Sequence, residues 1–261
     1  MSKYERLNRL LELLAADGHV SVEDAATRLD VSPATVRRDL DSLANQQLLT
    51  RTHGGAVSNS TAYDLPLRYK TARNAEEKVR IAHAAAGLVP FGSVVGLNGG
   101  TTTTEVARAL ATRADLHADS GQASVTVVTN ALNIANELTV RSQVKIVVLG
   151  GVPRAQSYEL VGPLAVPVLN QLTLDIAVLG VDAFDLSRGA SAHNEAEAEI
   201  NARIANQARR VLVVADSSKL GKTAFAQIVP ASKVHTLITD SDADPALVKE
   251  ISGAGIEVVQ T

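Results

Sequence analysis

The stretch SPATVRRDL, residues 32–40, decides the fold of the N-terminal part of this chain. Ser32 is a preferred helix-capping residue, and Pro33 suits the first turn of a helix. Apolar residues then recur at helical spacing, at Val36, Leu40 and Leu43. The stretch predicts a helix with one buried stripe and a polar outer face, which carries Thr35, Arg37, Arg38 and Asp41.

A second, shorter helix is predicted upstream, between Val22 and Leu29. The residues SVED at positions 21–24 have the pattern of a capping box, which opens a helix. Only Asp30 and Val31 separate the two helices. A short helix, a tight turn and a second helix with a doubly basic outer face are typical of a helix-turn-helix, whose second helix lies in the major groove of DNA.

The flanking segments predict a winged helix-turn-helix domain over residues 1–57. Leucines at positions 7, 10, 11 and 14 indicate a leading helix that ends at Asp17 and Gly18. The segment LLTRTHGGAV, residues 48–57, holds two β-prone runs and a Gly-Gly pair, as in a hairpin wing. Positive charge gathers on the second helix and the wing, so we predict DNA contacts from Ser32, Thr35, Arg37, Arg38, Arg51 and His53.

Charge and composition limit the function classes. Residues 1–60 carry seven Lys and Arg against eight Asp and Glu, so a three-helix interaction module without a DNA role stays open as the alternative. The net charge of −3 argues against a protein that coats nucleic acid. The absence of cysteine excludes disulfides and thiolate metal sites. No apolar leader and no apolar run of about 20 residues is found, so we expect a cytoplasmic protein without a membrane partner.

The remaining chain predicts a second domain of α/β class. Apolar periodicity fades in residues 58–75, which we interpret as a linker, and residues 76–261 form the second domain. Continuous β-prone runs are expected at residues 94–97, 125–128, 144–149, 176–179, 211–214 and 236–238. Helical segments alternate with them at residues 76–88, 102–110, 131–138, 195–209 and 245–251. This alternation predicts a mostly parallel, Rossmann-like sheet that is covered on both faces.

A glycine- and threonine-rich segment follows the first of these strands. Ligands bind beyond the carboxyl ends of the strands in such sheets, and NGGTTTT at residues 98–104 leads from a strand into a helix. Glycines let an anion approach the backbone, and helix N-terminal amides point toward it. A plain Asn-Gly turn is the alternative. We predict a phosphate-binding loop formed by Asn98, Gly99, Gly100, Thr101, Thr102 and Thr103.

Polar residues also follow the later strands. Asp182 and Asp216 are candidate acceptors for sugar hydroxyls, and Lys219 is a mobile cation for a phosphate. Asn130 and Arg154 follow two further strands, and Glu195 opens a helix, where it either faces the pocket or only favours the helix dipole. Singly, each fits a solvated turn. Their shared position after successive strands predicts an effector site.

Residues 6–40 resemble the signature of the DeoR family of bacterial transcription regulators. Arg6, Leu10 and Leu14 match its start, and SPATVRRDL matches its end. Similar segments continue as TN at 129–130, LGG at 149–151, LVGP at 160–163 and DSSK at 216–219. Where the family commonly has DAGTTT, this chain has NGGTTT from Asn98. The resemblance implies a repressor with a sugar-phosphate sensor, similar in fold to ribose-phosphate isomerase, whose partners are operator DNA and a phosphorylated sugar.

An enzyme is the competing function. Asp182 and Glu195 could shuttle a proton in an isomerase or deaminase. However, the isomerases carry a lysine and a glycine-rich loop where this chain has only Arg188 and Gly189, and a DNA-reading domain precedes the fold. We therefore expect no catalytic residue, metal or cofactor. Two-fold operator sites favour a homodimer or homotetramer.

Overall fold

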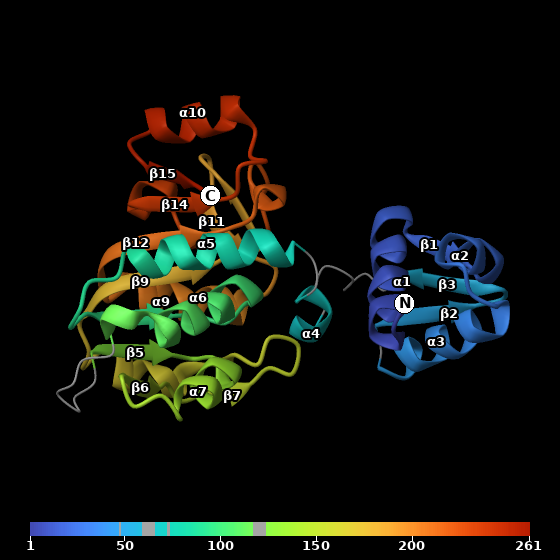
Figure 1. The fold of residues 1–261 in the computed structure, drawn as a ribbon, viewed down its shortest axis with the longest axis horizontal. Helices are drawn as coiled ribbons and strands as arrows, with labels where there is room; N and C mark the ends of the chain where they lie inside the picture. The colour runs from blue at the N-terminus through green and yellow to red at the C-terminus, as the bar shows by residue number, and fades with distance from the viewer. Residues whose placement is uncertain (47, 59–65, 72–73, 117–123) are drawn as a thin grey trace. The chain divides into compact units, whose positions relative to one another are not determined.

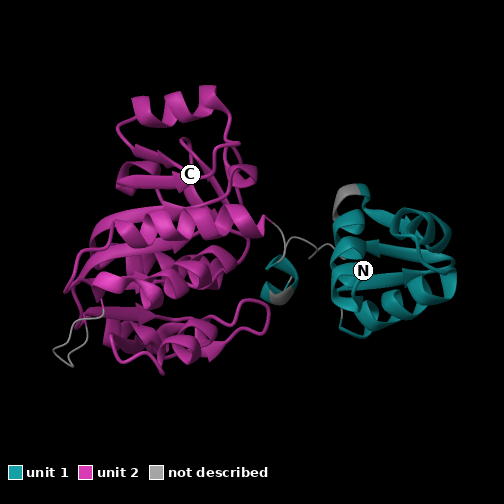
Figure 2. Cartoon of the chain, in the orientation of Figure 1, with its two compact units in different colours: residues 1–72 teal, residues 73–261 magenta. Residues whose placement is uncertain are grey.

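The computed structural model describes residues 1–46, 48–58, 66–71, 74–116 and 124–261. The chain divides into two compact units, an N-terminal unit of Met1–Ala72 and a C-terminal unit of Arg73–Thr261 (Figure 2).

The N-terminal unit packs three helices against a small antiparallel sheet (Figure 1). The helices are α1 (Lys3–Asp17), α2 (Val22–Leu29) and α3 (Pro33–Asn45), and a short α4 (Leu67–Lys70) follows. The strands are β1 (His19–Ser21), β2 (Leu49–Thr52) and β3 (Gly55–Ser58), in the order β1-β3-β2. The winged helix-turn-helix is confirmed, with β1 as a third strand that was not predicted.

The helix boundaries of this unit follow from capping. Gly18 ends α1 with a left-handed φ of 73°, a conformation that glycine adopts at little cost. The Ser21 side chain accepts a hydrogen bond from the Asp24 amide at the start of α2. Part of the expected linker packs with this unit, because Leu67 and Tyr69 are buried; residues 59–65 and 72–73 of it lie outside the described part.

A seven-stranded parallel sheet forms the centre of the C-terminal unit, in the order β15-β14-β12-β9-β4-β5-β6. All of its neighbouring strands run parallel. The strands are β4 (Val94–Leu97), β5 (Val125–Thr129), β6 (Val144–Val148), β9 (Leu174–Gly180), β12 (Ala208–Val214), β14 (Thr236–Thr239) and β15 (Glu257–Gln260). We call the edge at which β4, β5, β9 and β12 end the carboxyl edge.

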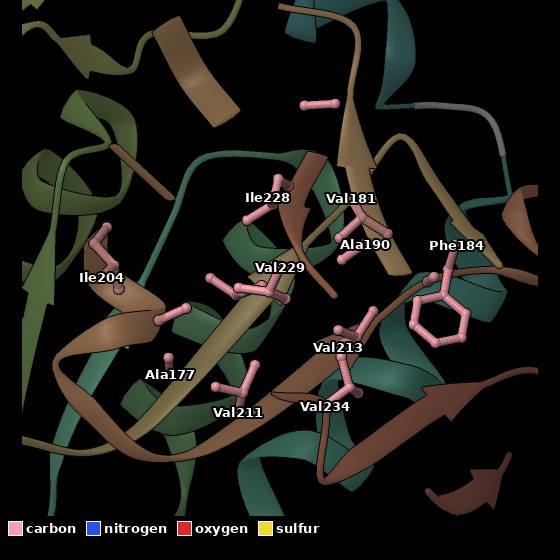
Figure 3. Close-up of a cluster of buried hydrophobic side chains, with 14 of the residues drawn as sticks. Ala177, Val181, Phe184, Ala190, Ile204, Val211, Val213, Ile228, Val229 and Val234 are labelled. Carbon is pink, nitrogen blue, oxygen red and sulfur yellow. The ribbon is translucent and has the colours of Figure 1, made fainter. Parts of the chain in front are cut away.

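Helices cover both faces of this sheet, as the sequence predicted. On one face, Ile176, Val178 and Leu212 pack with residues of α5 (Ala75–Gly87), α6 (Thr101–Thr112) and α7 (Leu132–Leu138). On the other face, Ala177, Val211 and Val213 pack with Ile204 of α9 (Glu195–Asn206) (Figure 3). Two more helices are α8 (Val166–Leu169) and α10 (Pro245–Gly253). Alternate side chains of each strand therefore enter separate cores.

Smaller elements extend from this sheet. An antiparallel sheet joins β10 (Ala183–Asp185), β11 (Gly189–Ala192) and β13 (Ala226–Val229), and a hairpin joins β7 (Val152–Pro153) to β8 (Leu160–Val161). Four 3-10 turns, η1 to η4, cover Ala114–Leu116, Pro163–Ala165, Ser217–Lys219 and Ala231–Lys233. The segment predicted to stay helical to Arg209 ends at Asn206 instead, because residues from Ala208 pair with β9.

Candidate functional site

Helix α3 presents a polar face above a fully buried stripe. Ser32 caps the helix, since its Oγ accepts a hydrogen bond from the Thr35 amide at 3.2 Å. Val36, Leu40 and Leu43 are completely buried, whereas Arg37 and Arg38 are exposed. The Ser32 and Thr35 hydroxyls lie 2.9 Å apart at the start of the helix. Arg37 and Arg38 are thus exposed and Thr35 is half-buried at the start of the helix, an arrangement that suits a groove-reading helix.

The exposed arginines are only loosely tied to the protein. Arg37 Nη2 lies 3.7 Å from Glu23 Oε1, and both side chains are more than half exposed. Arg38 Nε donates to the Ala34 carbonyl at 3.3 Å. Exposed pairs of this kind contribute little to stability, so both guanidinium groups are available to phosphates or bases.

The two wing residues predicted to contact DNA, Arg51 and His53, differ in exposure and in their bonds to the protein. Arg51 is half-buried; its Nε donates to Asp41 Oδ1 at 2.8 Å, and its Nη1 donates to the Gly55 carbonyl. These bonds fasten β2 to α3 and to β3, so Arg51 has a structural role that the sequence did not predict. His53 lies in the exposed turn between β2 and β3.

The loop after β4 turns at Gly100 directly into α6. Gly100 has a φ of 139°, which a residue with a side chain rarely adopts, and α6 begins at Thr101 without a side-chain cap. The Thr103 and Thr104 hydroxyls both donate to the Gly100 carbonyl, at 3.2 and 2.6 Å. Thr103 is also fully buried, so its hydroxyl is not a free donor. Thr102 is buried as well, whereas Thr101 is half-buried, so the amides at the start of α6 and the hydroxyl of Thr101 are the groups that could meet a phosphate.

Asn98 forms a bridge inside the sheet. Its Nδ2 donates to the Gly180 carbonyl at 2.9 Å, and its Oδ1 accepts from the Gly180 amide at 2.8 Å. This reciprocal pair joins the ends of β4 and β9. A carboxylate here could accept from the amide but could not donate to the carbonyl, so asparagine fits both groups. Asn98 is almost fully buried, and both polar atoms of its side chain are bonded to Gly180, so it has a structural role that the sequence did not predict.

A buried polar cluster lies beside this loop. Asn130 Nδ2 donates to Glu159 Oε2 at 3.0 Å, and the Glu159 side chain lies so close to Gly99 that a Cβ at Gly99 would collide with it. Arg154 Nη1 donates to Glu197 Oε1 at 3.0 Å. Burial, and then the neighbouring Glu197 carboxylate, raise the pKa of Glu159 to about 8. The hairpin residues Arg154 and Glu159 thereby meet α9 at the carboxyl edge.

Glu195 does not belong to this cluster. Its side chain is exposed, whereas Glu197 is buried. The sequence offered a signal for Glu197, because it precedes Asn201 and Ile204 by one and two helical turns on the buried face of α9. Glu159 and Asn201 also escaped the sequence analysis, since their partners are distant in the chain.

A second polar group forms at the end of β12. Asp216 accepts from Asn74 Nδ2 at 2.9 Å and from the Ser218 hydroxyl. Burial alone would raise the pKa of Asp216, but the bond from Ser218, the charge of Lys219 and the bond from Asn74 outweigh it and lower that pKa. The nearby ammonium of Lys78 on α5, which the sequence analysis missed, adds to this effect.

Lys219 and Asp182 are held at the end of β9. Lys219 Nζ donates to the Val181 carbonyl at 2.6 Å. Asp182 Oδ2 accepts from the His193 amide at 3.0 Å, and both residues are half-buried. Three features thus lie at the carboxyl edge: the loop after β4, the cluster around Glu159 and Glu197, and the cluster around Asp216 and Lys219. Among the described residues, no group of acidic, histidine or cysteine side chains has the arrangement of a metal site, and no helix is long and apolar enough to cross a membrane.

Comparisons with known proteins cover both units. Residues 6–62 match the DeoR-like helix-turn-helix domain, and residues 73–241 match the DeoR C-terminal sensor domain. The chain is 34% identical to a putative aga operon transcriptional repressor of Escherichia coli O157:H7, over 98% of this chain and 93% of that protein. It is 32% identical to the glycerol-3-phosphate regulon repressor of Escherichia coli K12, over 99% of both.

Solved structures resemble parts of the chain more distantly. A D-ribose-5-phosphate isomerase in complex with phospho-erythronic acid is 20% identical, with a TM-score of 0.41 over 56% of this chain and 54% of that chain. The sorbitol operon regulator SorC of Klebsiella pneumoniae is 14% identical, with a TM-score of 0.35 over 82% of this chain and 89% of that chain.

Proposed function

The chain belongs to the DeoR family of DNA-binding transcriptional regulators, and on this basis we propose that it represses a sugar-metabolism operon under control of a phosphorylated sugar. Relatives that match nearly its whole length are named as repressors of an aga operon and of a glycerol-3-phosphate regulon. The observation that carries the DNA-binding part is the polar side of α3, where Arg37 and Arg38 are exposed and the stripe at Val36, Leu40 and Leu43 is buried.

The effector is proposed to bind at the carboxyl edge of the sheet. The uncapped start of α6 offers amides to an anion, and Gly100 lets the chain turn there. Lys219 follows β12, and its Nζ lies at the end of the neighbouring strand β9, where it supplies a positive charge. A ligand at this edge can change operator affinity only if it binds the DNA-bound and free conformations unequally.

Catalysis is not part of this proposal. The full-length relatives above are named as regulators. The sequence offered Asp182 and Glu195 as a pair for proton transfer. In the structure the two carboxylates have different surroundings, because Glu195 is exposed and Asp182 accepts a hydrogen bond from the His193 amide.

We further propose a homodimer or homotetramer that acts in the cytoplasm, where operator DNA lies. Two-fold operators are matched by two-fold proteins. Strand β6 is an edge strand, and the exposed apolar residues Val148, Val152 and Leu164 occur on it and on the segments that follow. A second copy of the chain could cover them.

Two measurements on the full-length protein test the function. Fluorescence anisotropy with DNA from upstream of the protein's own gene should detect a specific site that unrelated DNA does not compete for at equal concentration. Thermal unfolding with a panel of sugar phosphates should identify an effector, because a ligand stabilises the state that binds it. No operator binding, or no phosphate-dependent stabilisation, would contradict the respective half of the proposal.

A further inference from the structure

The buried cluster of Glu159, Glu197, Asn130, Asn201 and Arg154 contains more hydrogen-bond acceptors than donors. Asn130 and Asn201 both donate to Glu159 through their side chains. Their Oδ1 atoms are shielded from solvent and have no partner in the described part of the chain. Both residues are at least nine-tenths buried. An unsatisfied buried oxygen costs about 1–3 kcal/mol, so a ligand that brings hydrogen-bond donors to these two oxygens gains affinity.

The cluster is also short of positive charge. Two carboxylates, those of Glu159 and Glu197, face one guanidinium, that of Arg154, which donates to Glu197. The Gly99 amide and the two asparagine amides are the neutral donors that Glu159 accepts from. A proton on Glu159 would restore charge balance, but it could satisfy only one of the two amide oxygens. A cation with several N–H donors would supply the missing positive charge and could also donate to both amide oxygens.

The cluster adjoins the proposed phosphate-binding loop. Glu159 lies against Gly99, immediately before the uncapped start of α6. Glu197 and Arg154 retain side-chain exposures of 11% and 16%, so the cluster is not sealed from this edge. A ligand whose phosphate meets α6 therefore has its other end close to Glu159 and Glu197.

We propose that this cluster is the binding site for a primary ammonium group, and that the effector is an amino sugar phosphate. An ammonium carries three N–H donors and no acceptor, which matches two carboxylates and two unpartnered amide oxygens. A sugar hydroxyl donates only one hydrogen bond and leaves the negative charge uncompensated. The inference rests on the proposed sugar-phosphate function and adds the chemical class of the ligand.

The test compares matched ligands on the full-length protein by isothermal titration calorimetry. Glucosamine phosphate and glucose phosphate, each phosphorylated on the terminal hydroxyl, differ only in an ammonium or hydroxyl at one carbon. The mannosamine pair inverts the configuration at that carbon, and the galactosamine pair keeps it but inverts a hydroxyl elsewhere on the ring. Inorganic phosphate probes the loop alone. We expect at least one amino sugar phosphate to bind on the order of tenfold more tightly than its neutral twin. Its binding should also release a proton from Glu159, seen as a heat that depends on the buffer.

Variants locate the preference. Glu159→Gln keeps the size of the side chain but cannot carry the charge, so we expect it to lose both the preference and the proton release while binding inorganic phosphate as the wild type does. Glu195→Gln removes an exposed carboxylate from the same helix as Glu197, and this variant should retain the preference for the amino sugar phosphate and the release of a proton. Should Glu159→Gln unfold at a lower temperature than the assay, Glu197→Gln provides the second test, with the same expected loss of preference.

Different results would contradict the ammonium site and the sugar-phosphate function. Equal affinity within every ligand pair, or a preference that survives in Glu159→Gln, would overturn the ammonium site while leaving a sugar-phosphate sensor intact. Failure of every phosphorylated ligand and of inorganic phosphate to bind would instead reject the sugar-phosphate function, and the ammonium site with it.

Discussion

Asn74 donates a side-chain hydrogen bond to Asp216 over 2.9 Å, and this bond joins the start of the C-terminal unit to the end of β12. Asn74 has a left-handed φ of 51°, an uncommon conformation for a residue with a side chain. The same Asp216 carboxylate is influenced by Lys219, a proposed effector contact. The expected linker therefore reaches the C-terminal unit at a residue that is bonded to the proposed effector site.

We expect Asn74→Ala to destabilise the C-terminal unit more than Asn74→Gly. Both changes remove the bond to Asp216, which costs about 1 kcal/mol, but alanine adds the strain of a left-handed conformation, about 1 kcal/mol more. Urea denaturation of the full chain measures the stability of both variants. The unfolding transition of the C-terminal unit is identified as the one that an added ligand shifts. Equal midpoints for the two variants would show that the conformation at Asn74 is not retained.

Arg37→Ala and Arg38→Ala should each weaken operator binding by about 1–3 kcal/mol if the side chain reads a base. A residue that contacts only phosphate should instead lower the slope of log affinity against log salt by about one. Arg209→Ala, an exposed arginine of the C-terminal unit, is the control. Unchanged affinity in both α3 variants across a salt titration would remove α3 from the DNA interface.

Asp39→Ala should lower the thermal stability of the N-terminal unit without acting through a DNA contact. Asp39 is buried and forms an ion pair with Arg6, which joins α3 to α1. Removing the carboxylate takes this hydrogen-bond acceptor from the half-buried Arg6 guanidinium and costs about 1–3 kcal/mol. Circular dichroism on heating should show an earlier transition in this variant. A wild-type melting curve would mean that the pair contributes little.

Glu159 should make the protein less stable as the pH rises from about 4.5 to about 8. Its pKa is raised in the folded state, so between these values the folded state holds a proton that the unfolded state has lost. The contribution is fully present below the unfolded pKa and disappears as the pH passes the folded pKa. Urea midpoints measured from pH 5 to pH 8 should fall more steeply in the wild type than in Glu159→Gln. Parallel curves would contradict the raised pKa.

Local patterns were sufficient to predict most of the fold. Ser32, Pro33 and the stripe at Val36, Leu40 and Leu43 fixed α3, because capping and periodicity depend on neighbours in the chain. The alternation of buried strands and helices likewise predicted the parallel sheet. Strand β1 was missed because it has three residues and is stabilised by pairing with the distant β3.

The candidate site was less accessible from the sequence. The loop from Asn98 was recognised because glycines and a following helix have a local signature. Glu159 acquires its character only from contacts with Asn130, Asn201 and Gly99, which lie 29 or more positions away along the chain. Arg51 appeared free in the sequence because its bonds to Asp41 and Gly55 depend on how the wing packs.

One titration measures whether a phosphorylated sugar controls operator binding through the loop at Gly100. Labelled operator bound to the full-length protein is titrated with the sugar phosphate that most raises its unfolding temperature, and with the same sugar without phosphate. We expect only the phosphorylated form to change operator affinity, and Gly100→Val to keep operator affinity but lose the response, because valine is strained at a φ of 139°. An equal response to both sugars, or an undiminished response in Gly100→Val, would contradict the account.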